Sequence, residues 1–127
     1  MNNTHKTLIL ITLVAVSLGC GYSKPSMTPT PGTTPTISQL NPASTTAGSA
    51  DFVLEVDGTN FATNAVISFA GNQMVTTPTA AGKLQATIPA SAVATARAVP
   101  VTVTNPGTGG IYGTPAVTSA AMQFMIN

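Results

Sequence analysis

At 127 residues the chain has room for one small domain beside a targeting segment, and 43% hydrophobic residues are enough to give that domain a core. Charged residues make up only 6% of the sequence, against roughly 25% in an average soluble domain. From Cys20 onward three positive residues balance three negative ones: Lys24, Lys83 and Arg97 against Asp51, Glu55 and Asp57. Without net positive charge, such a chain lacks the electrostatic surface that binds nucleic acid or anionic lipid.

Residues 1–19 have the composition of a secretory signal peptide, with a lysine near the start and an apolar run from Leu8 to Leu18. This run is too short to span a bilayer comfortably, which takes about 20 apolar residues. The sequence Val-Ser-Leu-Gly-Cys at 16–20 resembles the lipobox of bacterial lipoproteins. The resemblance implies that Cys20 receives diacylglycerol and becomes the first residue of the mature chain. The alternative is that Cys20 is an ordinary residue near an ordinary cleavage site.

A lipid on Cys20 would fix the cellular location of the protein. Two or three acyl chains anchor a protein stably without a transmembrane helix. Gly21 follows the cysteine instead of Asp, and in lipoproteins this position permits transfer to an outer membrane. We therefore expect an exported protein anchored to the bacterial cell envelope, on the outer membrane if the cell has one and otherwise on the outer face of the cytoplasmic membrane.

Residues 20–35 are predicted to form a disordered linker. The stretch from Ser23 to Thr36 reads SKPSMTPTPGTTPT, with four prolines, many threonines and no apolar pattern. This composition predicts an extended, mobile spacer. At the polyproline rise of about 3.1 Å per residue it could reach on the order of 40 Å.

Residues 36–127 are predicted to form one all-β domain, an antiparallel β-sandwich of about seven strands. Short segments with alternating apolar and polar residues are divided by Gly, Pro and Asn, and no amphipathic helix is evident. Six strands can be located, at residues 36–40, 52–58, 65–71, 84–89, 99–105 and 122–126. The large side chains expected to point inward are Phe52, Leu54, Val56, Phe61, Ile67, Phe69, Leu84, Ile88, Val99, Val101, Val103, Met122, Phe124 and Ile126.

The order of several short motifs resembles the IPT/TIG domains, which have an immunoglobulin-like fold of the E-set type. These motifs are Pro35-x-Ile37, Leu40-x-Pro42, Gly58-x-x-Phe61, Ile67-x-Phe69-x-Gly71, Ile88-Pro89, Val101-x-Val103, Asn105-Pro106-Gly107 and Phe124-x-Ile126. Gly58 is expected to relieve a tight turn, Phe61 to cover the end of the sandwich, and Pro106 to stop a strand. The segment 107–120 departs from the family pattern, because it is longer and richer in glycine than a tight hairpin connection.

The mature chain would contain few groups able to drive a reaction. The only histidine, His5, lies in the predicted signal peptide, which argues against catalytic triads and zinc sites, and we expect no enzyme activity and no cofactor. Glu55 and Asp57 lie on one strand face about 6.6 Å apart. We interpret this face as solvated, with a weak calcium site at Asp57 and Asn60 as the main alternative.

The glycine-rich loop contains the best candidate contact residues, Ile111 and Tyr112. Aromatic side chains on long loops often bind partners, although both could instead fold back onto the sandwich. We therefore expect a non-catalytic envelope lipoprotein that displays one module for protein or glycan binding, as the resemblance implies. The alternative is a periplasmic accessory or structural subunit of an envelope complex. Nucleic acid is not an expected partner, because the charge and the export signal argue against it.

Overall fold

The structure, a computed structural model, describes residues 32–127. The predicted signal peptide, Cys20 and the linker up to residue 31 lie outside the described residues. The described residues form ten strands and one short 3-10 helix, namely β1 (Thr36–Asn41), β2 (Ser44–Thr45), β3 (Phe52–Thr59), β4 (Val66–Phe69), β5 (Asn72–Gln73), β6 (Thr76–Ala80), β7 (Lys83–Ile88), η2 (Ala90–Val93), β8 (Arg97–Asn105), β9 (Val117–Thr118) and β10 (Met122–Ile126). Seven of these strands have four or more residues. The prediction of an immunoglobulin-like all-β sandwich is confirmed.

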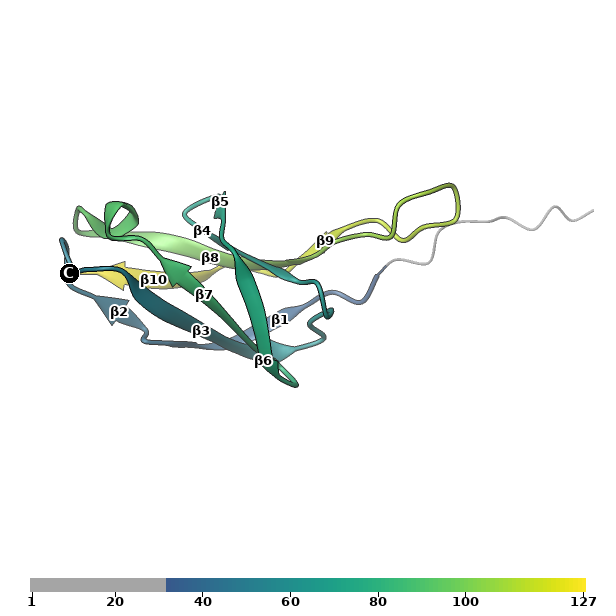
Figure 1. Cartoon of the computed structure of the whole chain (residues 1–127), viewed down its shortest axis with the longest axis horizontal. Coiled ribbons are helices and arrows are strands. Elements are labelled where there is room, and N and C mark those ends of the chain that lie inside the picture. Colours follow the sequence, from purple (N-terminus) through teal and green to yellow (C-terminus); the bar gives the residue numbers. More distant parts are fainter. Residues whose placement is uncertain (1–31) are drawn as a thin grey trace, which may run out of the picture.

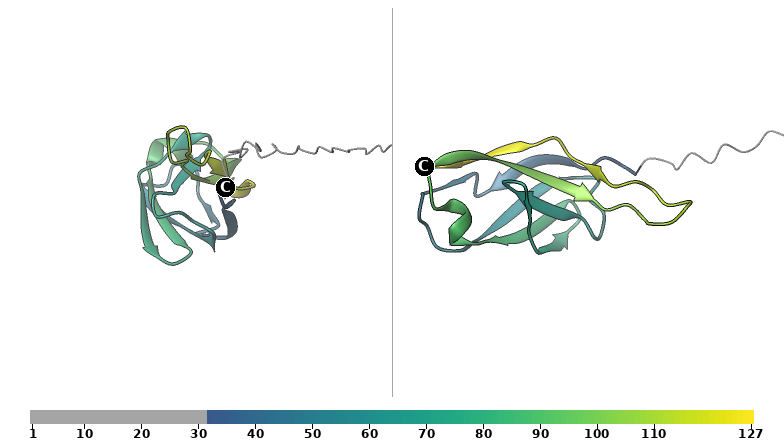
Figure 2. Two further views of the ribbon diagram at one scale, coloured as in Figure 1. Left: turned by 90° about the vertical axis from the view of Figure 1, so that its right-hand side faces the viewer. Right: turned by 90° about the horizontal axis from the view of Figure 1, so that it is seen from above.

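The strands form two sheets that pack face to face (Figure 1). One sheet has the order β1-β3-β7-β6, and the other has the order β2-β10-β8-β4-β5, with β9 also paired to β8. All pairs of strands in residues 32–127 are antiparallel except that of β2 with β10. The domain is elongated along the strands, with the C-terminus at one end and the connection between β8 and β9 at the other (Figures 1 and 2).

The six strands located from the sequence correspond to β1, β3, β4, β7, β8 and β10. Alternation is clearest in β3, where Leu54 and Val56 are fully buried between the sheets while Glu55 and Asp57 lie on the outer face. The sequence analysis did not locate β6, because its residues, TTPTA, include no large apolar side chain. No helix within residues 32–127 is long and apolar enough to cross a membrane.

The core lies between the two sheets and contains the predicted inward-facing side chains. Eleven of the fourteen are buried, and the other three, Phe52, Phe61 and Met122, pack against the core from its margin. Phe124 links the two sheets, because its ring stacks on Phe52 of β3 at 5.8 Å and meets the edge of Phe69 of β4 at 5.4 Å between centroids. Aromatic pairs of this kind add about 0.5–1.5 kcal/mol each beyond simple burial.

Gly58 does not occupy a turn, so that expectation was wrong. It lies inside β3 opposite Ile37 of β1, and a Cβ atom there would collide with the carbonyl oxygen of Thr36 and the ring of Phe61. Glycine is therefore needed because β1 approaches closely, and the left-handed backbone conformation falls on Asn60, at a φ of 62°. Phe61 packs against the core beside Gly58, as expected.

The segment that follows β8 forms two strands, β9 and β10, that both pair with β8 in the antiparallel direction. β8 ends at Asn105, before Pro106, as predicted. After a loop, β9 pairs with the end of β8, and β10 then pairs with its first half. Ser119 joins the two pairings, because its backbone amide donates to the carbonyl of Val103 and its Oγ accepts from the amide of Val103 at 3.0 Å. The long connection therefore extends the sheet instead of leaving it.

Candidate functional site

The buried side chain of Asn105 attaches the first described residues to the rest of the domain. The side chain of Asn105 accepts a hydrogen bond from the amide of Ala62 at 2.9 Å through Oδ1. Its Nδ2 donates to the carbonyl oxygens of Thr33 at 2.9 Å and Asn60 at 2.7 Å. Pro35 is fully buried nearby in the sequence. The end of the predicted mobile spacer, from Thr33 onward, is therefore attached to the domain.

A closed loop projects beyond this end, and we call residues 106–116 the β8–β9 loop. Its two legs are joined by Thr108 and Thr114, since the amide of Thr114 donates to Oγ1 of Thr108 at 2.9 Å. At the tip, the amide of Gly113 donates to the carbonyl of Gly110 at 3.2 Å. Gly110 has a φ of 104°, a conformation that favours glycine. The loop thus has a defined backbone.

The tip of the β8–β9 loop presents the two predicted contact residues to solvent. The exposed fractions of Ile111 and Tyr112 are 87% and 75%. They do not fold back onto the sandwich, which was the alternative. Residues 98–127 include no Asp, Glu, Lys, Arg or His, so the tip is an uncharged apolar projection.

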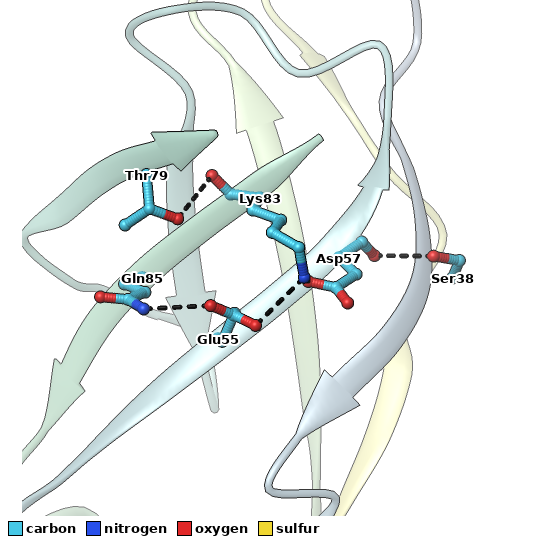
Figure 3. Close-up of polar contacts among 6 residues, drawn as sticks. All are labelled: Ser38, Glu55, Asp57, Thr79, Lys83 and Gln85. Carbon is cyan, nitrogen blue, oxygen red and sulfur yellow. Dashed lines mark hydrogen bonds and ion pairs between the residues drawn. The ribbon is translucent and has the colours of Figure 1, made fainter. Parts of the chain in front are cut away.

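The two carboxylates on β3 form a polar cluster with β7 (Figure 3). Nζ of Lys83 lies 3.2 Å from Oε1 of Glu55 and 2.9 Å from Oδ1 of Asp57. Nε2 of Gln85 donates to the second oxygen of Glu55 at 3.0 Å. The hydrogen bonds to Asp57 and then Glu55 raise the pKa of Lys83 above its ordinary value of 10.5. Two carboxylates that share one ammonium group in this way link β3 to β7 across the outer face and are poorly suited to acid-base chemistry.

The sequence analysis treated this face as simply solvated and did not identify Lys83 as the partner. The signal was available, because Lys83 immediately precedes the predicted strand at 84–89. Antiparallel pairing of that strand with residues 52–58 places Lys83 opposite Asp57 and Gln85 opposite Glu55. Side chains directly opposite on one face interact.

The contacts around Asp57 and Asn60 do not favour the calcium alternative. Asp57 is paired with Lys83, while the Nδ2 of Asn60 donates to the carbonyl of Thr34 at 3.3 Å. Within residues 32–127 no three His, Cys, Asp or Glu residues cluster as metal ligands would. Asp57 and Asn60 therefore each have a structural contact of their own, Asp57 with Lys83 and Asn60 with Thr34.

A second exposed apolar area lies on the outer face of the β3-β7-β6 sheet. Val53 and Val75 have exposed fractions of 52% and 91%. With Thr77, Gln85 and Thr87 they line a shallow groove of about 260 Å³. The sequence analysis placed Val53 on an outer face but assigned nothing to Val75, which lies outside the six located strands.

The order of the strands in the two sheets and the aromatic cluster packed between them define an immunoglobulin-like β-sandwich. Residues 35–119, about two thirds of the chain, match the IPT/TIG domain family, and the chain belongs to this family. The match is to a non-catalytic domain. No curated protein and no solved structure matches the chain. β10 follows the matched region and completes the sandwich.

Proposed function

We propose that the protein is a non-catalytic lipoprotein of the cell envelope, anchored through Cys20, whose single IPT/TIG module binds a protein or glycan. The observation that carries the non-catalytic part is that all three side-chain carboxylates in residues 32–127 accept hydrogen bonds from other groups of the domain. Asp51 accepts from the amide of Ala90 at 2.8 Å, and Glu55 and Asp57 accept from Lys83. With the carboxylates so engaged, binding through exposed side chains is the chemistry left to the module.

The groove at Val53 and Val75 suits a partner outside the membrane. Its lining residues lie in or beside β3, β6 and β7, and none belongs to the β8–β9 loop, which projects from the end of the sandwich. Two valines beside hydroxyl and amide groups combine apolar contact with hydrogen bonding, as ligand sites commonly do. A groove this shallow favours modest affinity and adhesion over enclosure of a small molecule.

The anchor is tested by the mass of the full-length protein extracted from bacterial envelopes. We expect residues 1–19 to be absent and the new N-terminal cysteine to carry diacylglycerol, with the protein in the membrane fraction. Cys20→Ala should abolish both the added mass and the membrane fractionation. An unmodified Cys20 in a processed, soluble protein would contradict the proposal.

The partner is tested by a photo-crosslinking residue at Val75 in intact envelopes, with Thr95, an exposed position in another part of the domain, as the matched control. We expect discrete crosslinked products from position 75 that are absent from position 95. A single stoichiometric envelope complex would favour the accessory-subunit alternative. Equal products from both positions would argue against the groove as the binding surface.

A further inference from the structure

The chain enters the domain at the end from which the β8–β9 loop projects. A Cβ atom on Gly32, the first described residue, would lie 3.5 Å from the carbonyl oxygen of Pro115 and 3.5 Å from a methyl group of Val117. Both views of the long axis place the loop beyond the strands, at the end opposite the C-terminus (Figures 1 and 2). The segment that leads back to Cys20 therefore starts beside the base of the loop.

The length of this segment limits how far the loop can be from a membrane that holds Cys20. Gly32 is the twelfth residue after Cys20, and twelve residue steps correspond to about 37 Å when fully extended as polyproline and about 20 Å as a flexible coil. Tethering at this distance gives the loop a local concentration relative to the bilayer surface in the millimolar range. Weak contacts between loop and bilayer are therefore sufficient.

The chemistry of the tip suits the interfacial region of a bilayer. Ile111 and Tyr112 are exposed, and no charged residue of 98–127 would have to lose water when the tip enters lipid. Tyrosine is enriched at the level of lipid headgroups, where its ring is apolar and its hydroxyl remains hydrated. The hydrogen bonds between Thr108 and Thr114 already order the loop, so binding requires little further ordering.

We propose that the β8–β9 loop is a second membrane contact, in which Ile111 and Tyr112 insert into the interface of the bilayer that holds the lipid on Cys20. This inference rests on the proposed anchor and names the partner of the predicted contact residues. Two attachments at one end hold the sandwich upright, with the C-terminal end away from the membrane. The groove at Val53 and Val75 then remains accessible to a soluble partner.

The test uses Tyr112→Trp in the lipidated full-length chain, which contains no other tryptophan. In phosphatidylcholine vesicles we expect its emission to shift to shorter wavelength. Brominated lipid should quench it at least about twofold more than it quenches the control Val75→Trp. Adding Ile111→Ser to Tyr112→Trp should reduce the quenching, while the circular-dichroism spectrum stays unchanged.

The intact mass of the same samples separates the two proposals. If Cys20 carries lipid and the tryptophan at position 112 is quenched no more than the one at 75, the loop contact is wrong and the anchor stands. If Cys20 carries no lipid, the proposed anchor is wrong, and so is the loop contact that depends on it. Emission at position 112 that shifts only with an envelope protein or glycan, and not with brominated vesicles, would overturn the bilayer as partner.

Discussion

Asn105 is the residue on which most segments of one end of the domain depend. Its amide group bonds to Thr33 before β1, to Asn60 after β3, and to Ala62 before β4. Aspartate could not replace it, because both Thr33 and Asn60 offer carbonyl oxygens that need a donor. One side chain thus joins the segment before β1 and the connection between β3 and β4 to the end of β8.

We expect Asn105→Ala to lower the free energy of unfolding by about 2–3 kcal/mol, because it removes a buried side chain and its three partly buried hydrogen bonds, each worth about 0.5–1.5 kcal/mol. Urea denaturation followed by circular dichroism measures the change. Asn72→Ala, on an exposed strand end, should change it by less than about 0.5 kcal/mol. Equal effects of the two substitutions would show that the Asn105 contacts contribute little.

The Lys83 cluster predicts a dependence of stability on high pH. Because the folded protein raises the pKa of Lys83, the stabilisation from its ion pairs is fully present below 10.5 and is lost as pH rises through the folded-state pKa above that value. The difference in free energy of unfolding between wild type and Lys83→Met should therefore be constant from about pH 7, where carboxylates are ionised, up to pH 10.5, and shrink above it.

Lys83→Arg provides the matched control, since a guanidinium stays charged throughout this range. The free energy of unfolding of Lys83→Arg should remain above that of Lys83→Met at high pH. If the wild type and Lys83→Arg lose stability in parallel, another group is responsible for the pH dependence.

These residue-level contacts were only partly predictable. The sequence predicted that Asn105 ends a strand. Its hydrogen-bond partners, however, are 43 to 72 positions away in the chain, and the residues around Asn105 give no sign of them. Lys83 could have been predicted from the register of two strands. Ile111 and Tyr112 were predicted as contact residues because they are apolar residues in a glycine-rich loop, and their exposure agrees with that expectation.

At the level of elements, the pairing of β1 with β3 depends on the missing side chain of Gly58. We expect Gly58→Ala to lower the free energy of unfolding by about 2–3 kcal/mol, since the neighbour that must move is backbone and not a flexible side chain. Thermal denaturation and amide exchange of β1 measure the effect. Gly109→Ala, which meets nothing within 4 Å, should be neutral, and a similar loss there would refute the steric explanation.

Elements with one buried face were found from their sequence, and elements without one were missed. In β8, Val99, Val101 and Val103 alternate with more exposed residues and gave a clear strand signal. The strand β6 has no buried residue and contains Pro78, so neither alternation nor propensity marked it. The helix η2 was missed because four residues are too few for a helical period, although Val93 within it is fully buried.

At the scale of the whole molecule, the balanced charge predicts how the proposed loop contact responds to lipid composition. Lys24, Lys83 and Arg97 oppose an equal number of carboxylates, and the loop has no charge. Quenching of Tyr112→Trp should therefore be equal in neutral and anionic vesicles and insensitive to added salt. A clear preference for anionic lipid, lost at high salt, would point to a basic surface instead of the apolar tip.

β10, the last strand in the sequence, has an interior position in its sheet. This strand lies between β2 and β8, and the amide of Asn127 donates to the carbonyl of Thr45 at 2.9 Å. Strand β2 therefore cannot pair with its sheet until residues 122–127 are present. For the export proposed above, the chain would cross the membrane unfolded, and a sheet that lacks β10 until residues 122–127 are made stays incomplete for most of its synthesis.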